Sequence, residues 1–138
     1  MKMRFLLLLL SVLLMFSVGC RKAAIRPEGG VPATIVHENF TAKDMREAIL
    51  KGCTNASWRA TDIDTNTLEA TYIERGGNRI AVVSIHYTAT SYTINYKSSV
   101  NLKYKAKNDG TFALHYKYNT WIENLDQSIR NNLAKKMT

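Results

Sequence analysis

The sequence predicts an α+β domain in which a short helix and a C-terminal helix pack on one face of a four-stranded antiparallel meander. Four runs of alternating apolar and polar residues follow one another between residues 57 and 97. The links between them hold only a few residues, which favours antiparallel neighbours because a parallel pair needs a longer crossover. An apolar stripe at helical spacing closes the chain, and its 138 residues support one domain.

The first helix is expected just after Phe40, where the folded domain, residues 40–138, begins. Thr41 and Asp44 have the spacing of a capping box. Apolar residues then recur at helical spacing, at Met45, Ala48 and Ile49. Gly52 predicts the end of this helix, which at about ten residues is too short to be stable without packing on the rest of the domain.

The four strands are expected at residues 57–63, 67–75, 79–87 and 92–97, with a tight hairpin turn at Gly76-Gly77-Asn78. Alternation places one set of side chains against the helices: Trp58, Ala60, Leu68, Ala70, Tyr72, Ala81, Val83, Ile85, Tyr87, Tyr92, Ile94 and Tyr96. The other face is mostly polar and either docks a protein or glycan or is simply solvated: it carries Arg59, Thr61, Glu69, Thr71, Ser84, His86, Thr93, Asn95 and Lys97.

A long polar connection leads from the last strand to the final helix. Asn108-Asp109-Gly110 favours a turn, so residues 100–114 either form an extra small hairpin or remain a loop. The final helix is expected from Tyr116 or Asn119 to Lys135. Its apolar stripe comprises Tyr118, Trp121, Ile122, Leu125, Ile129 and Leu133.

The N-terminus has the pattern of a secretory signal peptide, residues 1–19. Lys2 and Arg4 precede an apolar run of twelve residues, which is too short for a permanent membrane span. The following Ser17-Val18-Gly19-Cys20 resembles the lipobox of bacterial lipoproteins. That resemblance implies cleavage before Cys20 and acylation of its thiol by chains such as palmitate, which anchor the protein on a membrane.

Residues 20–39, which include both prolines and Gly29-Gly30, are expected to form a flexible tether. In lipoproteins of this kind, an aspartate after the acylated cysteine favours retention in the inner membrane. Arg21 occupies that position here, so the resemblance implies the outer membrane, with the domain facing the periplasm.

The mature chain is basic, with seventeen Lys and Arg against eleven Asp and Glu, a net charge of +6. Such a domain attracts anionic lipids, lipopolysaccharide phosphates or acidic partners, unless the charge only solvates its surface. Nucleic acid fits the charge but not the compartment. The candidate basic patch comprises Lys97, Lys103, Lys105 and Lys107.

Several of these features together resemble a group of small, mostly uncharacterised bacterial lipoproteins. The residues that carry the resemblance, between about 48 and 130, are Trp58, Tyr92-Thr93-Ile94-Asn95-Tyr96, Ser98-Ser99, Asn101-Leu102, His115, Tyr118-Asn119-Thr120-Trp121 and Leu125. The loop at residues 103–109 is longer than in that group. The resemblance implies secretion and a common fold, and it implies no catalytic activity.

No catalytic or metal motif is evident, so we expect no cofactor. A candidate binding groove for a sugar or peptide comprises Tyr92, Tyr96, Ser98, Asn101, His115, Tyr118 and Asn119; alternatively these tyrosines only fill the core. Cys53 is expected to be buried, with an intermolecular disulfide as the alternative.

The sequence therefore favours a lipid-anchored binding or scaffolding protein of the cell envelope, rather than an enzyme, with a membrane and an envelope protein or glycan as partners. Two alternatives remain. One is a small envelope hydrolase that uses His115 or His86, and the other is a binder of anionic lipid or lipopolysaccharide through the basic patch. The oligomeric state is left open.

Overall fold

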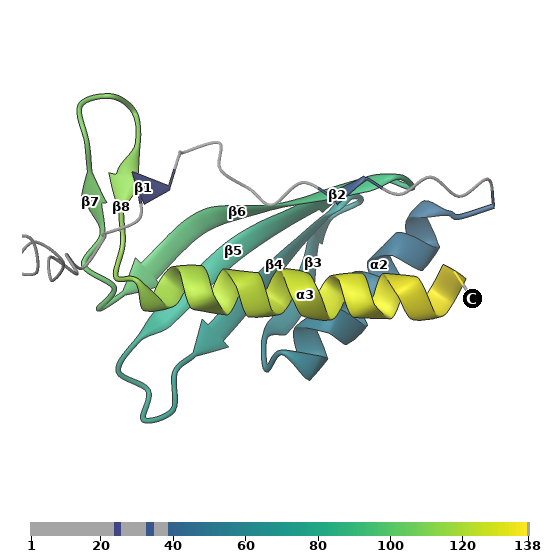
Figure 1. Ribbon diagram of the computed structural model, residues 1–138, viewed down its shortest axis with the longest axis horizontal. Helices are drawn as coiled ribbons and strands as arrows, with labels where there is room; N and C mark the ends of the chain where they lie inside the picture. Colours follow the sequence, from purple (N-terminus) through teal and green to yellow (C-terminus); the bar gives the residue numbers. More distant parts are fainter. Residues whose placement is uncertain (1–23, 26–32, 35–38, 138) are drawn as a thin grey trace, which may run out of the picture.

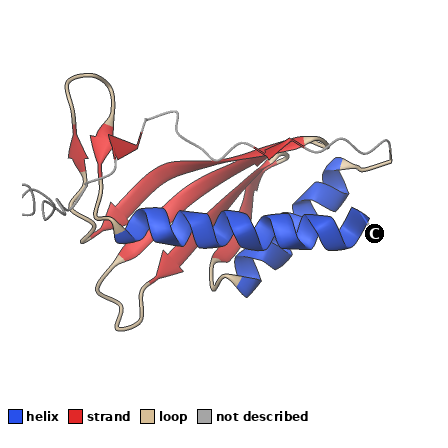
Figure 2. Ribbon diagram, in the orientation of Figure 1, coloured by secondary structure: helices blue, strands red, loops and turns tan. Residues whose placement is uncertain are grey.

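An antiparallel sheet of four long strands, covered on one face by two helices, forms the domain (Figures 1 and 2). The computed structural model describes residues 24–25, 33–34 and 39–137. The elements are α2 (Ala42–Asn55), β3 (Arg59–Asp64), β4 (Thr67–Ile73), β5 (Ile80–Tyr87), β6 (Ser91–Val100) and α3 (Lys117–Met137). The predicted α+β class, the meander and the C-terminal helix on the sheet are confirmed.

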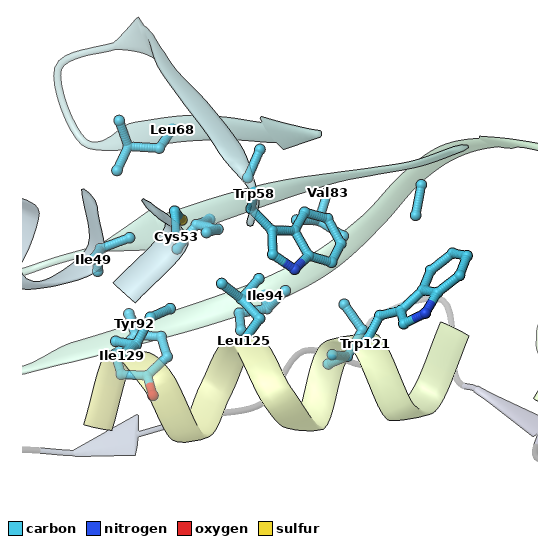
Figure 3. Close-up of a cluster of buried hydrophobic side chains, with 14 of the residues drawn as sticks. Ile49, Cys53, Trp58, Leu68, Val83, Tyr92, Ile94, Trp121, Leu125 and Ile129 are labelled. Atoms are coloured by element: carbon cyan, nitrogen blue, oxygen red, sulfur yellow. The ribbon is translucent and has the colours of Figure 1, made fainter. Parts of the chain in front are cut away.

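Both helices begin and pack largely as their sequence pattern predicts. The capping box of α2 is present: the Asp44 amide donates to Thr41 Oγ1 over 3.2 Å, and the Thr41 amide donates to Asp44 Oδ2 over 3.0 Å. All six residues of the predicted α3 stripe are buried. Figure 3 shows Trp121, Leu125 and Ile129 of α3 in the core with Ile49, Cys53 and Ile94.

Gly52 does not end the first helix, which continues to Asn55. An ideal Cβ on Gly52 would lie only 2.7 Å from the Cα of Ile129. The missing side chain therefore lets α2 and α3 approach backbone to backbone. Ser128 Oγ donates to the Gly52 carbonyl over 2.8 Å at the same crossing. Gly52 is a packing residue, and the prediction that it terminates the helix was wrong.

The fourth strand also runs further than predicted, to Val100. A bulge explains the difference, because Val82 pairs with Ser98 and Val83 with Tyr96, so that Lys97 has no partner in register. The extra residue shifts the alternation of β6. Ser98 and Val100 consequently lie on the uncovered face of the sheet, whereas Tyr96 lies on the covered face.

The connection after β6 contains the extra hairpin that the sequence left open, β7 (Lys105–Ala106) with β8 (Phe112–Ala113). Two pieces of the expected tether pair with the domain: β1 (Ala24–Ile25) with β8, and β2 (Ala33–Thr34) with β6. Both pairings lie within residues 20–39, the segment for which a flexible tether was predicted. Two-residue strands are too short to show a periodic pattern, so the sequence offered no sign of them.

The predicted signal peptide, its expected cleavage site and Cys20 lie outside the described residues. Within those residues, no helix has both the length and the apolar character needed to cross a membrane.

Candidate functional site

One end of the domain gathers most of its excess positive charge. This hairpin end comprises residues 73–80, around the β4–β5 turn, and residues 100–117, from the end of β6 to the start of α3. It lies opposite the C-terminus of α3 along the long axis of the molecule (Figure 1). Contacts join its two segments: Lys117 Nζ lies 2.5 Å from Glu74 Oε1, and Asn101 Nδ2 donates to the Asn78 carbonyl over 2.7 Å.

The charge is unevenly divided between this end and the rest of the domain. The hairpin end has a net charge of +4, from Arg75, Arg79, Lys103, Lys105, Lys107 and Lys117 against Glu74 and Asp109. The body, which we define as residues 39–72, 81–99 and 118–137, carries eight basic and seven acidic side chains, a net charge of +1. The molecule therefore has a basic end and a nearly neutral body.

An unusual loop exposes the first lysine of this end. Asn101 and Lys103 both have a positive φ, of 55° and 53°, on either side of Leu102. The Leu102 side chain is buried, and its carbonyl accepts a hydrogen bond of 2.7 Å from the His115 amide. Asparagine tolerates this left-handed conformation, whereas lysine adopts it at a cost. Leu102 thus anchors the loop in the core while Lys103 remains exposed.

Aromatic rings lie among these lysines. Tyr104 stacks on Tyr96 with centroids 5.2 Å apart and planes 3° from parallel. Phe112 contacts both rings, and Tyr118 meets Tyr96 edge to face. Tyr104 is nevertheless 51% exposed, and Tyr116, whose ring lies 4.5 Å from that of His115, is 61% exposed. The hairpin end therefore offers two amphipathic rings beside its cations.

The hairpin end also has exposed aliphatic side chains, which lie side by side on neighbouring strands of the sheet. Ile73, Ile80 and Val100 are aligned in register on three adjacent strands, on the face that the helices do not cover. Ile73 is 53% exposed and Val100 is 49% exposed. Most of the large exposed apolar side chains of the described residues thus belong to the hairpin end.

Glu74 is the one carboxylate that ties the two segments together. Besides Lys117, it accepts a hydrogen bond of 3.0 Å from Arg79, and these cations, Lys117 first, lower the pKa of its carboxyl group. Within the part of the chain that the structure describes, no ion pair joins Arg75, Lys103 or Lys105 to a carboxylate. These three cations remain available to an external anion.

His115 lies within this basic end, at the entry to α3. Its Nδ1 accepts the Lys117 amide over 3.3 Å. Burial, followed by the neighbouring cations Arg79, Lys103 and Lys117, lowers its pKa. In a Ser-His-Asp triad a carboxylate orients the histidine. The nearby Glu74 is instead held by Lys117 and Arg79.

His86 has a closer partner, on the uncovered face of the sheet. Its Nδ1 lies 2.6 Å from Oγ1 of Thr67, a buried residue. Asp64 interacts with the Asn66 amide and the Thr67 hydroxyl, and these hydrogen bonds, the one from Asn66 first, lower its pKa. In a Ser-His-Asp-type triad the carboxylate bonds the far nitrogen of the histidine. Here Asp64 instead contacts Thr67, the hydroxyl residue, and its hydrogen bonds stabilise the turn between β3 and β4.

The predicted groove is only partly assembled. Tyr96 and Tyr118 meet, with ring centroids 5.8 Å apart, and His115 and Asn119 lie nearby at the start of α3. Tyr92 is instead buried (Figure 3), and its hydroxyl donates to Asp126 Oδ1 over 2.5 Å. Ser98 lies on the opposite face of the sheet. Both residues are therefore removed from the candidate groove.

The predicted basic patch changes membership as well. Lys97 forms an ion pair with Glu69 on the uncovered face and is not part of the hairpin end. Lys103, Lys105 and Lys107 remain, and Arg75, Arg79 and Lys117 join them. The predicted meander already implied that Arg75 and Arg79 lie near Lys103, because its second and fourth strands run in the same direction and finish at the same end of the sheet.

The remaining polar features are a buried cysteine and a shallow hollow. Cys53 is buried, as predicted, and burial raises the pKa of its thiol to about 12, so it is unreactive at neutral pH. No group of three or more His, Cys, Asp or Glu residues suited to a metal ion occurs among residues 39–137. A shallow hollow of about 450 Å³ between the end of α2 and α3 is lined mainly by Asn, Gln and Ser side chains.

The chain matches no protein-family model, no curated protein and no solved structure. The resemblance to small bacterial lipoproteins stays a prediction, and the geometry and charge of the hairpin end are the basis for a functional conclusion.

Proposed function

We propose that this protein is a lipid-anchored binding or scaffolding protein of the bacterial cell envelope, and not an enzyme. Acylated Cys20 holds it on the outer membrane, with the domain facing the periplasm. The hairpin end binds an anionic component of that envelope. No nucleic acid and no cofactor take part in this function.

The unequal division of charge is the observation that carries the proposal. A basic protein that only solvated its surface would have no need to concentrate a net charge of +4 at one end of its domain. Like charges held together raise the free energy of the fold, and an anion that binds between them relieves that repulsion. The exposed rings of Tyr104 and Tyr116 add apolar contact beside the cations.

The anchor is tested by growing cells that express the full chain with labelled palmitate. We expect the label on the wild-type protein and its recovery with outer membranes, whereas Cys20→Ala should carry no label. An unlabelled wild-type protein would overturn the anchored part of the proposal.

The binding surface is tested with a matched pair of charge variants of the full chain. The hairpin variant, Lys105→Gln with Lys107→Gln, and the body variant, Lys43→Gln with Lys51→Gln, each remove two exposed lysines and so have the same net charge. On a phosphate-bearing resin, the hairpin variant should elute at clearly lower salt than the body variant. Equal elution of the two variants would show that only total charge matters and would overturn the assignment of the surface.

A further inference from the structure

The N-terminal segment rejoins the fold at the hairpin end. Ala24 pairs with Ala113 and Ile25 with Phe112, so β1 lies on the edge of the β7–β8 hairpin (Figure 1). Only residues 21–23 separate Cys20 from Ala24. Four steps of fully extended chain span at most about 14 Å. Whatever its conformation, this short link holds Ala24, and the position on β8 where it pairs, within that distance of Cys20.

We infer that the hairpin end docks on the anionic phospholipid headgroups of the same leaflet that holds the lipid on Cys20. This inference rests on the proposed function, because it requires an acylated Cys20. It goes further by naming the ligand and the orientation. The long axis of the domain is then directed away from the membrane, and the C-terminal end of α3 lies at the far end of the domain from the bilayer (Figure 1).

The chemistry of the hairpin end suits a headgroup layer. Lys103, Lys105 and Lys107 are exposed, and lysines near a membrane surface are attracted to anionic lipids over about one Debye length, roughly 8 Å in physiological salt. Exposed Tyr104 and Tyr116 have the amphipathic rings that favour the boundary between headgroups and acyl chains.

The short link also favours this surface over other anions. Anchoring makes docking intramolecular, so the leaflet around Cys20 is presented to the hairpin at a high effective concentration. A domain on a long free tether would meet the same headgroups with any of its faces. Pairing of β1 with β8 removes that freedom and selects the end that has the excess of cations.

Fluorescence quenching of a site-specific dye on the full, acylated chain tests the inference. The protein is reconstituted in phosphatidylcholine vesicles with or without phosphatidylglycerol, and a headgroup-linked quencher reports the depth of a dye. The dye is attached at Asn108→Cys in the hairpin turn, or at Ala134→Cys near the end of α3, both of which are exposed positions. Buried Cys53 should stay unlabelled, because the pKa of its thiol is raised to about 12.

We expect quenching at least several-fold stronger at position 108 than at position 134 when phosphatidylglycerol is present, and a loss of this difference in high salt. The hairpin variant should weaken docking by roughly fivefold for each lysine removed, whereas the body variant should not. A third variant, Lys103→Gly, removes a charge where the positive φ suits glycine, so it tests the surface without disturbing the loop.

Two failures are distinguishable. If the wild-type protein does not associate with vesicles and carries no lipid, the proposed function fails and the inference with it. If it is anchored but positions 108 and 134 are quenched equally, or quenching at 108 ignores both salt and phosphatidylglycerol, the docked orientation alone is wrong.

Discussion

The body and the hairpin end use their charges in opposite ways. In the body, Arg46 donates to both carboxylate oxygens of Asp62, over 2.9 and 2.5 Å, and Arg130 donates to Asp126 over 2.7 Å. At the hairpin end the cations outnumber the carboxylates, and only Glu74 bridges two of them. Charge in the body links α2 to the sheet and braces α3, whereas much of the charge at the hairpin end is not needed for folding.

Their aromatic residues differ in the same sense. Trp58, Tyr72 and Trp121 form a row in the body, with ring centroids 5.4 and 4.7 Å apart, and both tryptophans are buried. Tyr104 and Tyr116 at the hairpin end are more than half exposed. The comparison teaches that one end of a small domain can display rings that its core does not bury, beside an excess of cations.

The largest expected effect separates these two sets of rings. Trp121→Ala should destabilise the domain by about 3–5 kcal/mol, because a buried ring is replaced by a cavity. Tyr116→Ala, at an exposed ring, should change the free energy of unfolding by about 0.5 kcal/mol or less. Urea unfolding followed by circular dichroism measures both. A comparable loss in the two variants would show that the exposed rings of the hairpin end stabilise the fold as the buried rings do, and the comparison would fail.

A pair of glycines gives the next largest effect. Gly52→Ala should cost about 1–3 kcal/mol through overpacking, since its Cβ would meet the backbone of Ile129, less up to about 1 kcal/mol for the better helix propensity of alanine. Gly110 of the hairpin end has open space around it but a φ of 79°. Gly110→Ala should therefore cost only about 1–2 kcal/mol of backbone strain.

Asparagine distinguishes the two causes. Gly110→Asn should recover most of the stability lost in Gly110→Ala, because asparagine tolerates a left-handed backbone, whereas Gly52→Asn should be worse than Gly52→Ala. Thermal or urea unfolding of the four variants measures these differences. Rescue at position 52 would mean that α2 and α3 are not in contact there.

Gly52 also shows where sequence reasoning stops. The capping box at Thr41 and Asp44, the alternation of β4 and β5 and the stripe of α3 were predictable, because each depends on residues a few positions apart. The role of Gly52 depends on Ile129, in another helix, and a glycine near a helix end usually marks its C-terminus. Only the packed structure separates the two roles.

The candidate site was harder to predict for a related reason. Because Lys97 is an extra residue in β6, Ser98 lies on the opposite face of the sheet from the one predicted. Lys97 itself forms an ion pair with Glu69. Bulges leave almost no trace in an alternating pattern of tyrosine, serine and lysine. The contact of Lys117 with Glu74 joins distant parts of the chain. The meander topology predicts only that these parts lie at the same end of the sheet.

The smallest expected effect is a pH dependence confined to the hairpin end. Burial and then Arg79, Lys103 and Lys117 lower the pKa of His115 from its usual 6.5, so the unfolded chain binds this proton more readily than the folded one. The stability that the neutral imidazole contributes is therefore fully present above pH 6.5 and is lost as the pH falls from there through the folded pKa.

Carboxylates do not obscure this window. The pKa values of Glu47 and Glu74 are lowered, in each case chiefly by a lysine hydrogen bond, so their contribution to stability is lost only below their usual pKa of 4.5. Urea midpoints are measured between pH 6.5 and pH 4.5. As the pH is lowered across this range, the midpoint should fall for the wild type and stay level for His115→Gln. His86→Gln is the control for the other described histidine. A fall that persists in His115→Gln, or an imidazole proton resonance of His115 that titrates above 6.5, would mean that the cations do not surround this ring in solution. A level profile in that variant alone would place the acid-sensitive step of the domain at the hairpin end, apart from the ion-paired body.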